Sequence, residues 1–347
     1  MILSESKILV TRTDRLGDVL LATPVLKKIR EFYPHVKLSF LVREEWMPVL
    51  QYGDEVNLIA YRPNMSVKEL AAILSEHNFD VAIVLRDEAV VSQAIKKAEI
   101  PVRVGPYSTL RSLLTFNQGL LQRRSRCSKH EAEYNLELLQ RIKIPAAKPA
   151  RVAEELPHSW IHYSTQVRSD IDQWQKANHM LGVKFWCLHP GSSGSARYLQ
   201  PGRMMELVYE CLARLAPHDG AKLVITGGPH EEALLQEIKS KAPDVVIFGG
   251  EHNLGLAALA ELYRRADLVI AHGTGPLHLA AAVDTRVLAI FPPLHVLSER
   301  RWGPLTAKRL TWIPAVECPE KYRCRGPKCK YYDCMDRFEV GATLDRL

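Results

Sequence analysis

The chain has 347 residues, of which 47% are apolar and 24% are charged. This length and mixture exclude a disordered or fibrous protein and predict two globular domains. A formal net charge of +7 predicts an acidic partner, which could be nucleic acid, an anionic membrane surface or a phosphorylated substrate, unless the charge only aids solubility. No segment has the length of a transmembrane helix or the pattern of a signal peptide, so we expect a cytoplasmic protein.

Short β-branched and leucine-rich runs alternate with amphipathic helical patterns in the first half of the chain. The runs predicted to be strands are Lys7–Thr11, Lys37–Val42, Val81–Leu85 and Pro101–Val104. Such alternation predicts a parallel sheet covered by helices on both faces. We therefore expect a doubly wound α/β domain over residues 1–155, which ends in a Pro- and Ala-rich stretch at residues 144–157.

The second half repeats this pattern over residues 156–347. Its predicted strands are Val183–Leu188, Ala221–Thr226, Val245–Phe248, Leu268–Ala271 and Val287–Phe291. Two Rossmann-like domains in tandem would face a central cleft, where the carboxyl ends of the strands bind ligands. No helix-turn-helix, aromatic RNA-binding signature or zinc-finger spacing is present, so we expect no nucleic-acid partner.

The first predicted strand leads into the loop RTDRLGD, residues 12–18, and then into a helical pattern. The carboxyl end of this strand is where α/β folds present side chains to a ligand. Gly17 permits a tight turn, and Asp18 stands at the start of the helix. Asp18 either caps the helix or acts as a general base that takes a proton from an acceptor hydroxyl.

Three loops in the second half combine small residues with polar ones. The first, residues 189–198, carries serines and Arg197, which suit a diphosphate or a flexible polar loop. The second, residues 227–232, carries Glu231, which either accepts bonds from a ribose or favours a helix start. The third, residues 271–282, opens a helix and contains His278, a phosphate contact or a buried histidine.

Together these motifs resemble glycosyltransferase family 9, the heptosyltransferases of lipopolysaccharide assembly. The segment RTDRLGDVLLATP is similar to the family's opening motif. The segments HPGSSGSAR, TGGPHEE and GTGPLHLAAA are similar to its donor-site loops and stand in the same order. The resemblance implies a GT-B fold, in which domain 1–155 binds the acceptor and domain 156–347 binds a nucleotide-sugar.

The resemblance also implies roles for individual residues. Asp18 would be the base of an inverting displacement in which an acceptor hydroxyl attacks a heptose and ADP leaves, with no cofactor required. The residues that would bind the donor are Ser192, Ser193, Arg197, Glu231, Thr274, Gly275 and His278. The acidic acceptor would meet Arg12 and Arg15, with further candidates among the arginines of the same domain: Arg43, Arg86, Arg103 and Arg111.

One position departs from the family pattern. Studied heptosyltransferases carry Asp before the Thr/Ser-Gly pair, where it contacts donor-sugar hydroxyls, and this chain has Gly273 there. A carboxylate that binds hydroxyls discriminates strongly among sugars. We expect ADP-heptose as donor and a lipid-linked lipopolysaccharide-core acceptor met at the cytoplasmic face of the inner membrane, with another nucleotide-sugar, or a protein or other glycan acceptor, as alternatives.

Four of the seven cysteines lie within seventeen residues near the C-terminus: Cys318, Cys324, Cys329 and Cys334. Four thiolates would enclose a structural Zn or Fe ion, and some members of the resembled family hold iron with cysteines. The spacing differs from a zinc knuckle, however, and reduced thiols or a disulfide are the alternatives.

Two other classes of protein are alternatives. A nucleotide-binding oxidoreductase is disfavoured because the first turn lacks the G-x-G-x-x-G pattern. A non-catalytic sugar-nucleotide binding protein would bind donor without turnover, and Asp18→Asn would change nothing.

Overall fold

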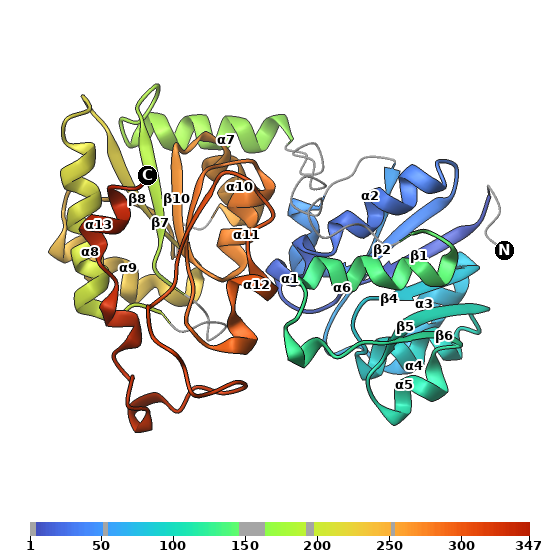
Figure 1. Ribbon diagram of the computed structural model, residues 1–347. Coiled ribbons are helices and arrows are strands. Elements are labelled where there is room, and N and C mark those ends of the chain that lie inside the picture. The colour runs from blue at the N-terminus through green and yellow to red at the C-terminus, as the bar shows by residue number, and fades with distance from the viewer. Residues whose placement is uncertain (1–4, 51–54, 146–163, 192–197, 251–253) are drawn as a thin grey trace. The chain divides into compact units, whose positions relative to one another are not determined.

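The computed structural model describes residues 5–50, 55–145, 164–191, 198–250 and 254–347 (Figure 1). The chain divides into two compact units, residues 1–162 and 163–347. The predicted boundary after residue 155 falls in the stretch 146–163, outside the described residues, so its position stays a prediction. Each unit is described by itself.

Unit 1 is built on a six-stranded parallel sheet in the order β3-β2-β1-β4-β5-β6. Its strands are β1 (Lys7–Thr11), β2 (Lys37–Arg43), β3 (Asn57–Tyr61), β4 (Val81–Val84), β5 (Val102–Tyr107) and β6 (Gln118–Leu121). The order of strands reverses between β1 and β4, so the loops after these strands flank a topological switch point.

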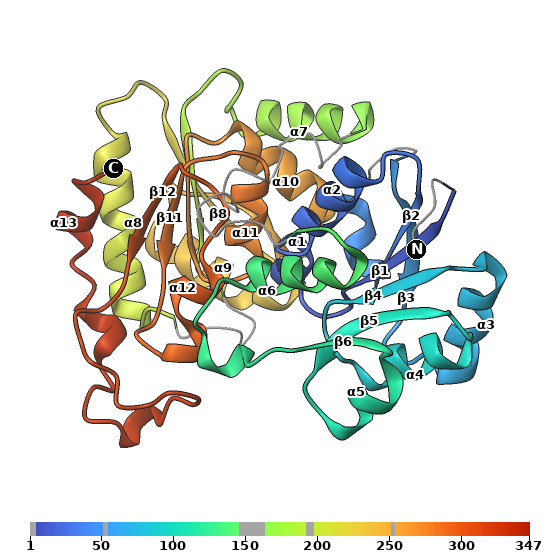
Figure 2. The same cartoon turned by 45° about the vertical axis from the view of Figure 1, so that its right-hand side comes forward.

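Helices cover both faces of this sheet, which is why its central strands are almost continuously apolar and buried. The helices are α1 (Leu16–Leu20), α2 (Thr23–Phe32), α3 (Val67–His77), α4 (Ala89–Lys97), α5 (Leu110–Thr115) and α6 (Glu131–Glu137). Short 3₁₀ turns are η1 (Glu44–Val49), η3 (Arg124–Arg126) and η4 (Leu138–Ile142). Helix α2 packs beside α6, and α4 packs between α3 and α5 (Figure 2).

Unit 2 repeats the same strand order, counted from its own first strand, in a six-stranded parallel sheet β12-β11-β10-β7-β8-β9. Its strands are β7 (Phe185–His189), β8 (Lys222–Gly227), β9 (Val246–Gly249), β10 (Leu268–His272), β11 (Val287–Ile290) and β12 (Arg309–Trp312). Here the switch point lies between β7 and β10. The prediction of a doubly wound α/β chain is confirmed.

The sheet of unit 2 is also covered by helices. They are α7 (Thr165–Ala177), α8 (Pro201–Leu215), α9 (Glu232–Lys241), α10 (Gly255–Arg265), α11 (Gly275–Ala282), α12 (Glu299–Trp302) and α13 (Val340–Leu344). The 3₁₀ turns are η7 (Pro229–Glu231), η9 (His295–Leu297), η10 (Gly326–Lys328) and η11 (Cys334–Arg337). None of the helices in the described part of the chain is both long and apolar enough to cross a bilayer.

Candidate functional site

Hydrogen bonds from neighbouring elements hold the loop after β1 in place. Arg43, at the end of β2, donates from Nε to the carbonyl of Thr13 at 2.7 Å, and Trp46 donates from Nε1 to the carbonyl of Asp14 at 2.9 Å. On the other side, Thr13 Oγ1 donates to Glu88 Oε2 at 2.5 Å, at the start of α4. Contacts from β2 and from the chain after β4 therefore fix this loop at the switch point.

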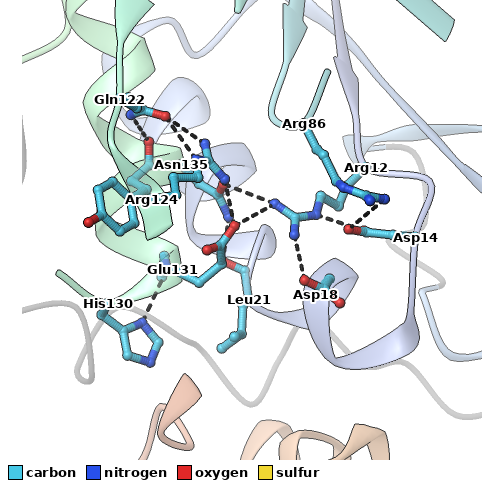
Figure 3. Close-up of polar contacts among 12 residues, drawn as sticks. Arg12, Asp14, Asp18, Leu21, Arg86, Gln122, Arg124, His130, Glu131 and Asn135 are labelled. Atoms are coloured by element: carbon cyan, nitrogen blue, oxygen red, sulfur yellow. Dashed lines mark hydrogen bonds and ion pairs between the residues drawn. The ribbon is translucent and has the colours of Figure 1, made fainter. Parts of the chain in front are cut away.

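A buried arginine is the centre of this edge of the sheet (Figure 3). Arg12 is 2% exposed, and its guanidinium contacts three carboxylates: Nε to Asp14 at 2.7 Å, Nη2 to Asp18 at 2.5 Å and Nη1 to Glu131 at 3.0 Å. Nη1 also donates to Asn135 Oδ1 at 3.3 Å. We call these five residues the Arg12 cluster. Because every charge in it is wholly or largely removed from water, the carboxylates depend on the Arg12 cation for stabilisation.

Glu131 and Asn135 come from α6, where their spacing of four residues places them on one face of the helix. Glu131 Oε1 also accepts from Arg124 Nη1 at 2.5 Å, and Asn135 Nδ2 donates to the carbonyl of Leu21 at 3.3 Å. Sequence analysis missed both residues. A polar pair at this spacing in a short helix was the available signal, but nothing local connects it with Arg12.

Asp18 is the third residue of α1 and does not cap it. The N-cap is Arg15, and no side chain bonds to the first turn as a cap, so the capping interpretation is wrong. The Asp18 side chain is 15% exposed, and among described residues only Arg12 donates to it. Burial raises its pKa to about 6; Arg12 lowers the pKa, while Asp14 and Glu131 raise it.

The arginines expected at an acceptor have different surroundings. Arg12 is buried, and its guanidinium donates to the other four residues of the Arg12 cluster. We therefore assign it a positioning role in place of the acceptor contact that the sequence led us to expect. Arg43 binds the carbonyl of Thr13, and Arg103 binds the backbone carbonyls of residues 100 and 115. Arg15 and Arg86 are exposed, and Arg86 pairs with Asp14 at 3.5 Å. Arg15 remains the predicted acceptor contact.

In unit 2, a buried polar group lies at the switch point between β7 and β10. His189 Nδ1 shares a hydrogen bond with Thr226 Oγ1 at 3.0 Å, and Thr226 shares another with Tyr263 at 2.9 Å. His189 Nε2 lies 3.6 Å from Glu231 Oε2. Burial lowers the pKa of His189, although Glu231 opposes this, so the imidazole is neutral at pH 7 and the contact is not an ion pair.

Glu231 lies at the predicted ribose position, and its carboxylate is firmly held. Oε2 accepts from the backbone N–H of Gly228 at 2.8 Å. A Cβ atom built on Gly191 would lie 1.4 Å from Glu231 Oε1, so a side chain at position 191 would displace the carboxylate from its present place. Gly191 precedes residues 192–197, and Ser192, Ser193 and Arg197 lie in that stretch, outside the described residues. Their role stays a prediction.

The third predicted loop joins β10 to α11. Thr274 is the N-cap of α11, but its Oγ1 donates to the carbonyl of His272 at 3.2 Å and caps no N–H group of the helix. Gly275 is the first helical residue, and His278 is buried one turn later. The N–H groups at the start of α11 therefore suit an anion.

His272 is a buried residue of this edge that sequence analysis did not select. Its Nε2 accepts the backbone N–H of Leu199 at 3.1 Å, so the neutral ring carries its proton on Nδ1. Burial, together with His189, lowers the pKa of His272 to about 3, which keeps the ring neutral. Nδ1 has no hydrogen-bond partner among the described residues.

Gly273, where the resembled family has Asp, is packed against an aromatic ring. A Cβ atom at this position would lie 2.4 Å from Cε1 of Phe291, a fully buried side chain that follows β11. The space that an Asp side chain needs is therefore occupied by Phe291.

Replacing Gly273 with Asp is expected to lower the free energy of unfolding by about 1–3 kcal/mol, because the new side chain overpacks the core. Urea denaturation measures this change. Gly202→Asp is the matched control, since open space surrounds that glycine in the first turn of α8. The double variant Gly273→Asp/Phe291→Leu should lose less stability than the sum of the two single variants, since both changes affect the contact between position 273 and the Phe291 ring. An unchanged urea midpoint for Gly273→Asp would contradict the packing argument.

In the described part of the chain, the structure does not gather the C-terminal cysteines into a metal site, so that site stays a prediction. Among the described residues, no three His, Cys, Asp or Glu side chains come close enough together to hold a metal ion. Cys334 is buried in the core of unit 2, whereas Cys318, Cys324 and Cys329 are half-buried, and no disulfide joins any of the four. The sulfurs of Cys324 and Cys329 accept local backbone N–H groups.

Comparison with known proteins assigns the chain to a family. The family model of glycosyltransferase family 9 (heptosyltransferase) matches residues 67–327. A Haemophilus influenzae protein provisionally named a glycosyltransferase is 29% identical over 308 residues, which cover 86% of each chain. Lipopolysaccharide heptosyltransferase 3 of Escherichia coli is 21% identical over 300 residues, covering 83% of this chain and 84% of the relative.

Among solved structures, a family 9 glycosyl transferase from Veillonella parvula superposes with a TM-score of 0.76 at 21% identity, covering 90% of this chain and 87% of that one. This similarity confirms the GT-B fold. Since the family model matches most of the chain, the family assignment does not depend on distant structural similarity. The chain belongs to glycosyltransferase family 9 and is a glycosyltransferase enzyme.

Proposed function

We propose that this enzyme transfers heptose from ADP-heptose to an inner-core lipopolysaccharide acceptor, with Asp18 as general base. The observation that carries the proposal is the Asp18 carboxylate, which lies at the carboxyl edge of the sheet with a pKa raised to about 6. A base with a pKa near the working pH is well suited to accept a proton during the reaction. The family and the E. coli heptosyltransferase 3 relative support heptose as the transferred sugar.

The reaction proceeds as a single inverting displacement. Asp18 takes the proton of the acceptor hydroxyl, and the oxygen of that hydroxyl forms a bond to C1 of the heptose. The bond from C1 to the diphosphate oxygen breaks, and its electron pair leaves with ADP. Within the Arg12 cluster, Arg12 holds the Asp18 carboxylate in position and limits how far its pKa is raised by burial, Asp14 and Glu131.

The donor binds to unit 2 through its three strand-end loops. The start of α11 and the side chains of Ser192, Ser193 and Arg197 stabilise the charge that develops on the leaving diphosphate. Glu231 accepts a hydrogen bond from the ribose. Neutral His272 donates from Nδ1 to an acceptor on the donor, because that buried N–H has no partner among the described residues. No metal or other cofactor is needed for this chemistry.

A second donor is favoured by one observation. Phe291 fills the space in which a carboxylate at position 273 would contact sugar hydroxyls. An apolar ring at this place fits a donor sugar that has fewer hydroxyl groups facing it than heptose has. Transfer of a sugar other than heptose by the same base and the same fold is therefore the alternative.

A panel of nucleotide-sugars tests the proposal. The full chain is assayed for release of nucleoside diphosphate from ADP-heptose, ADP-glucose and UDP-sugars, with a Kdo-lipid A type acceptor and with no acceptor. Acceptor-dependent turnover of ADP-heptose is the expected result. Turnover of a different sugar would replace the donor and retain the base, whereas donor binding without turnover would overturn the enzymatic proposal in favour of a sugar-nucleotide binding protein.

A further inference from the structure

Helix α5 presents leucines to solvent. Leu110, Leu113 and Leu114 stand at positions i, i+3 and i+4, which share one helix face. Leu110 is 82% exposed and Leu114 is 74% exposed, and Leu121, at the end of β6, is 68% exposed. Single exposed leucines are common on protein surfaces, but a helix that exposes its whole apolar face marks an interaction site.

These leucines belong to one surface of unit 1. Tyr107, three residues before α5, pairs in register with Leu121 of β6. Both views show α5 beside β5 and β6, at the margin of the unit (Figures 1 and 2). We call the four leucines the leucine surface.

The chain segment that carries the leucine surface is strongly basic. Residues 96–129 contain eight Lys and Arg and a single carboxylate, Glu99. Three of these cations pair with carboxylates outside the segment: Arg111 with Asp87, Arg124 with Glu131 and Lys129 with Glu137. The cations lie close to the leucines. Lys96 Nζ donates to the carbonyl of Leu114 at 3.0 Å, and the exposed residues Arg123 and Arg126 follow Leu121 directly.

We propose that the leucine surface docks unit 1 onto an anionic lipid bilayer. The leucines enter the boundary between headgroups and acyl chains, and the surrounding cations contact anionic headgroups. A second copy of the chain fits this surface poorly, since a symmetric contact would bring two strongly cationic segments together. An anionic bilayer supplies both the apolar layer and the negative charge.

Docking at this surface would bring the base to its acceptor. The loops that follow parallel strands lie at one edge of a sheet, so the start of α5, after β5, and Asp18, after β1, lie at the same edge of unit 1. This inference extends the proposed function, because a lipid-linked acceptor is held at that bilayer. Its test does not depend on turnover.

Sedimentation with vesicles tests the proposal. The full chain is mixed with vesicles of phosphatidylglycerol and phosphatidylethanolamine, or of phosphatidylcholine alone, at low and high salt. We expect binding to the anionic vesicles that weakens at high salt. Leu110→Ser/Leu113→Ser/Leu114→Ser should lower the partition coefficient about tenfold or more, since the apolar contribution is lost. Leu181→Ser/Leu254→Ser is the matched control, with two exposed leucines of unit 2, and should bind as the unchanged protein does.

The outcomes separate the two proposals. Failure of the unchanged protein to bind anionic vesicles, or equal binding by the triple variant, would overturn the docking surface. A dimer seen by light scattering that the triple variant abolishes, without lipid binding, would assign the surface to a second copy and also overturn it. Turnover with a delipidated acceptor should be unchanged in the triple variant. Vesicle binding without any sugar transfer would leave the docking surface standing and count against the proposed function alone.

Discussion

Replacing Asp18 with Asn is expected to lower kcat by about 10²–10⁴-fold, because an amide cannot accept the proton of the acceptor hydroxyl. The amide oxygen can still accept from Arg12, so the shape of the site is retained. Acceptor-dependent release of nucleoside diphosphate measures the effect. Glu45→Gln removes an exposed carboxylate near the end of β2 and should leave kcat unchanged.

The Asp18→Asn variant is expected to be more stable than the unchanged protein. The pKa of Asp18 is raised from 3.8 to about 6 in the folded state, so ionised Asp18 disfavours folding above pH 6. A neutral Asn removes this cost, which is about 1–3 kcal/mol. Below about pH 4 the carboxyl is protonated in the folded and the unfolded chain, and the gain should vanish. Urea denaturation at pH 7.5 and pH 4 measures both values.

The pH dependence of kcat/KM provides an independent check. Activity should fall on the acid side with an apparent pKa near 6, as Asp18 takes up a proton and can no longer act as a base. Full activity of Asp18→Asn would contradict the assignment of the base. A large loss of activity together with a lower urea midpoint would indicate damage to the fold in place of the loss of a base.

Replacing Arg12 with Met is expected to lower the free energy of unfolding by about 3–5 kcal/mol, because it removes a buried cation that three carboxylates share. Glu131 keeps Arg124 and Asp14 keeps Arg86, whereas Asp18 keeps no cation among the described residues. Methionine retains much of the side-chain length, so the loss is mainly electrostatic. Since Arg12 lowers the pKa of Asp18, that pKa rises further in the variant, and the deficit in stability should shrink as the pH falls. Urea denaturation at pH 8 and pH 5 measures the deficit.

A double variant separates the charge effect from the loss of packing. Arg12→Met/Glu131→Gln removes the cation and one of its carboxylates, so we expect it to lose less stability than the sum of the two single variants. Arg103→Met is the control, because that arginine donates to backbone carbonyls and neutralises no buried carboxylate in the described structure. Additive losses at positions 12 and 131 would show that the Arg12 cluster is not held together by charge.

Most of the fold could be predicted from the sequence, and the omissions share a physical cause. The strands found by their apolar runs lie within two residues of the observed bounds, except that β5 extends three residues beyond its predicted end at Val104. The strands that were missed are β3, β6 and β12, and each lies at the edge of a sheet. An edge strand is exposed along one side, so it lacks the continuous apolar run of a central strand; β12 has no buried residue at all.

The candidate site was predicted less completely, because its contacts are not local. The strand-end motifs indicated Asp18, Glu231 and the start of α11, since such positions follow from the βα pattern itself. The bond between Arg12 and Glu131 joins residues 119 positions apart, and no local pattern reports it. Likewise, the sequence revealed that Gly273 lacks a carboxylate but could not show that Phe291 occupies the space.

The Arg12 cluster also affects how this sequence can change over time. Loss of Arg12 alone would leave Asp18 without a cation among the described residues, and would remove one of the two cations that pair with Asp14 and with Glu131. Substitutions at these positions therefore have to arise together, or in an order that keeps the buried charges balanced at every step. In an alignment of related chains, we expect positions 12 and 131 to vary jointly, even though only Asp18 is assigned to the chemistry.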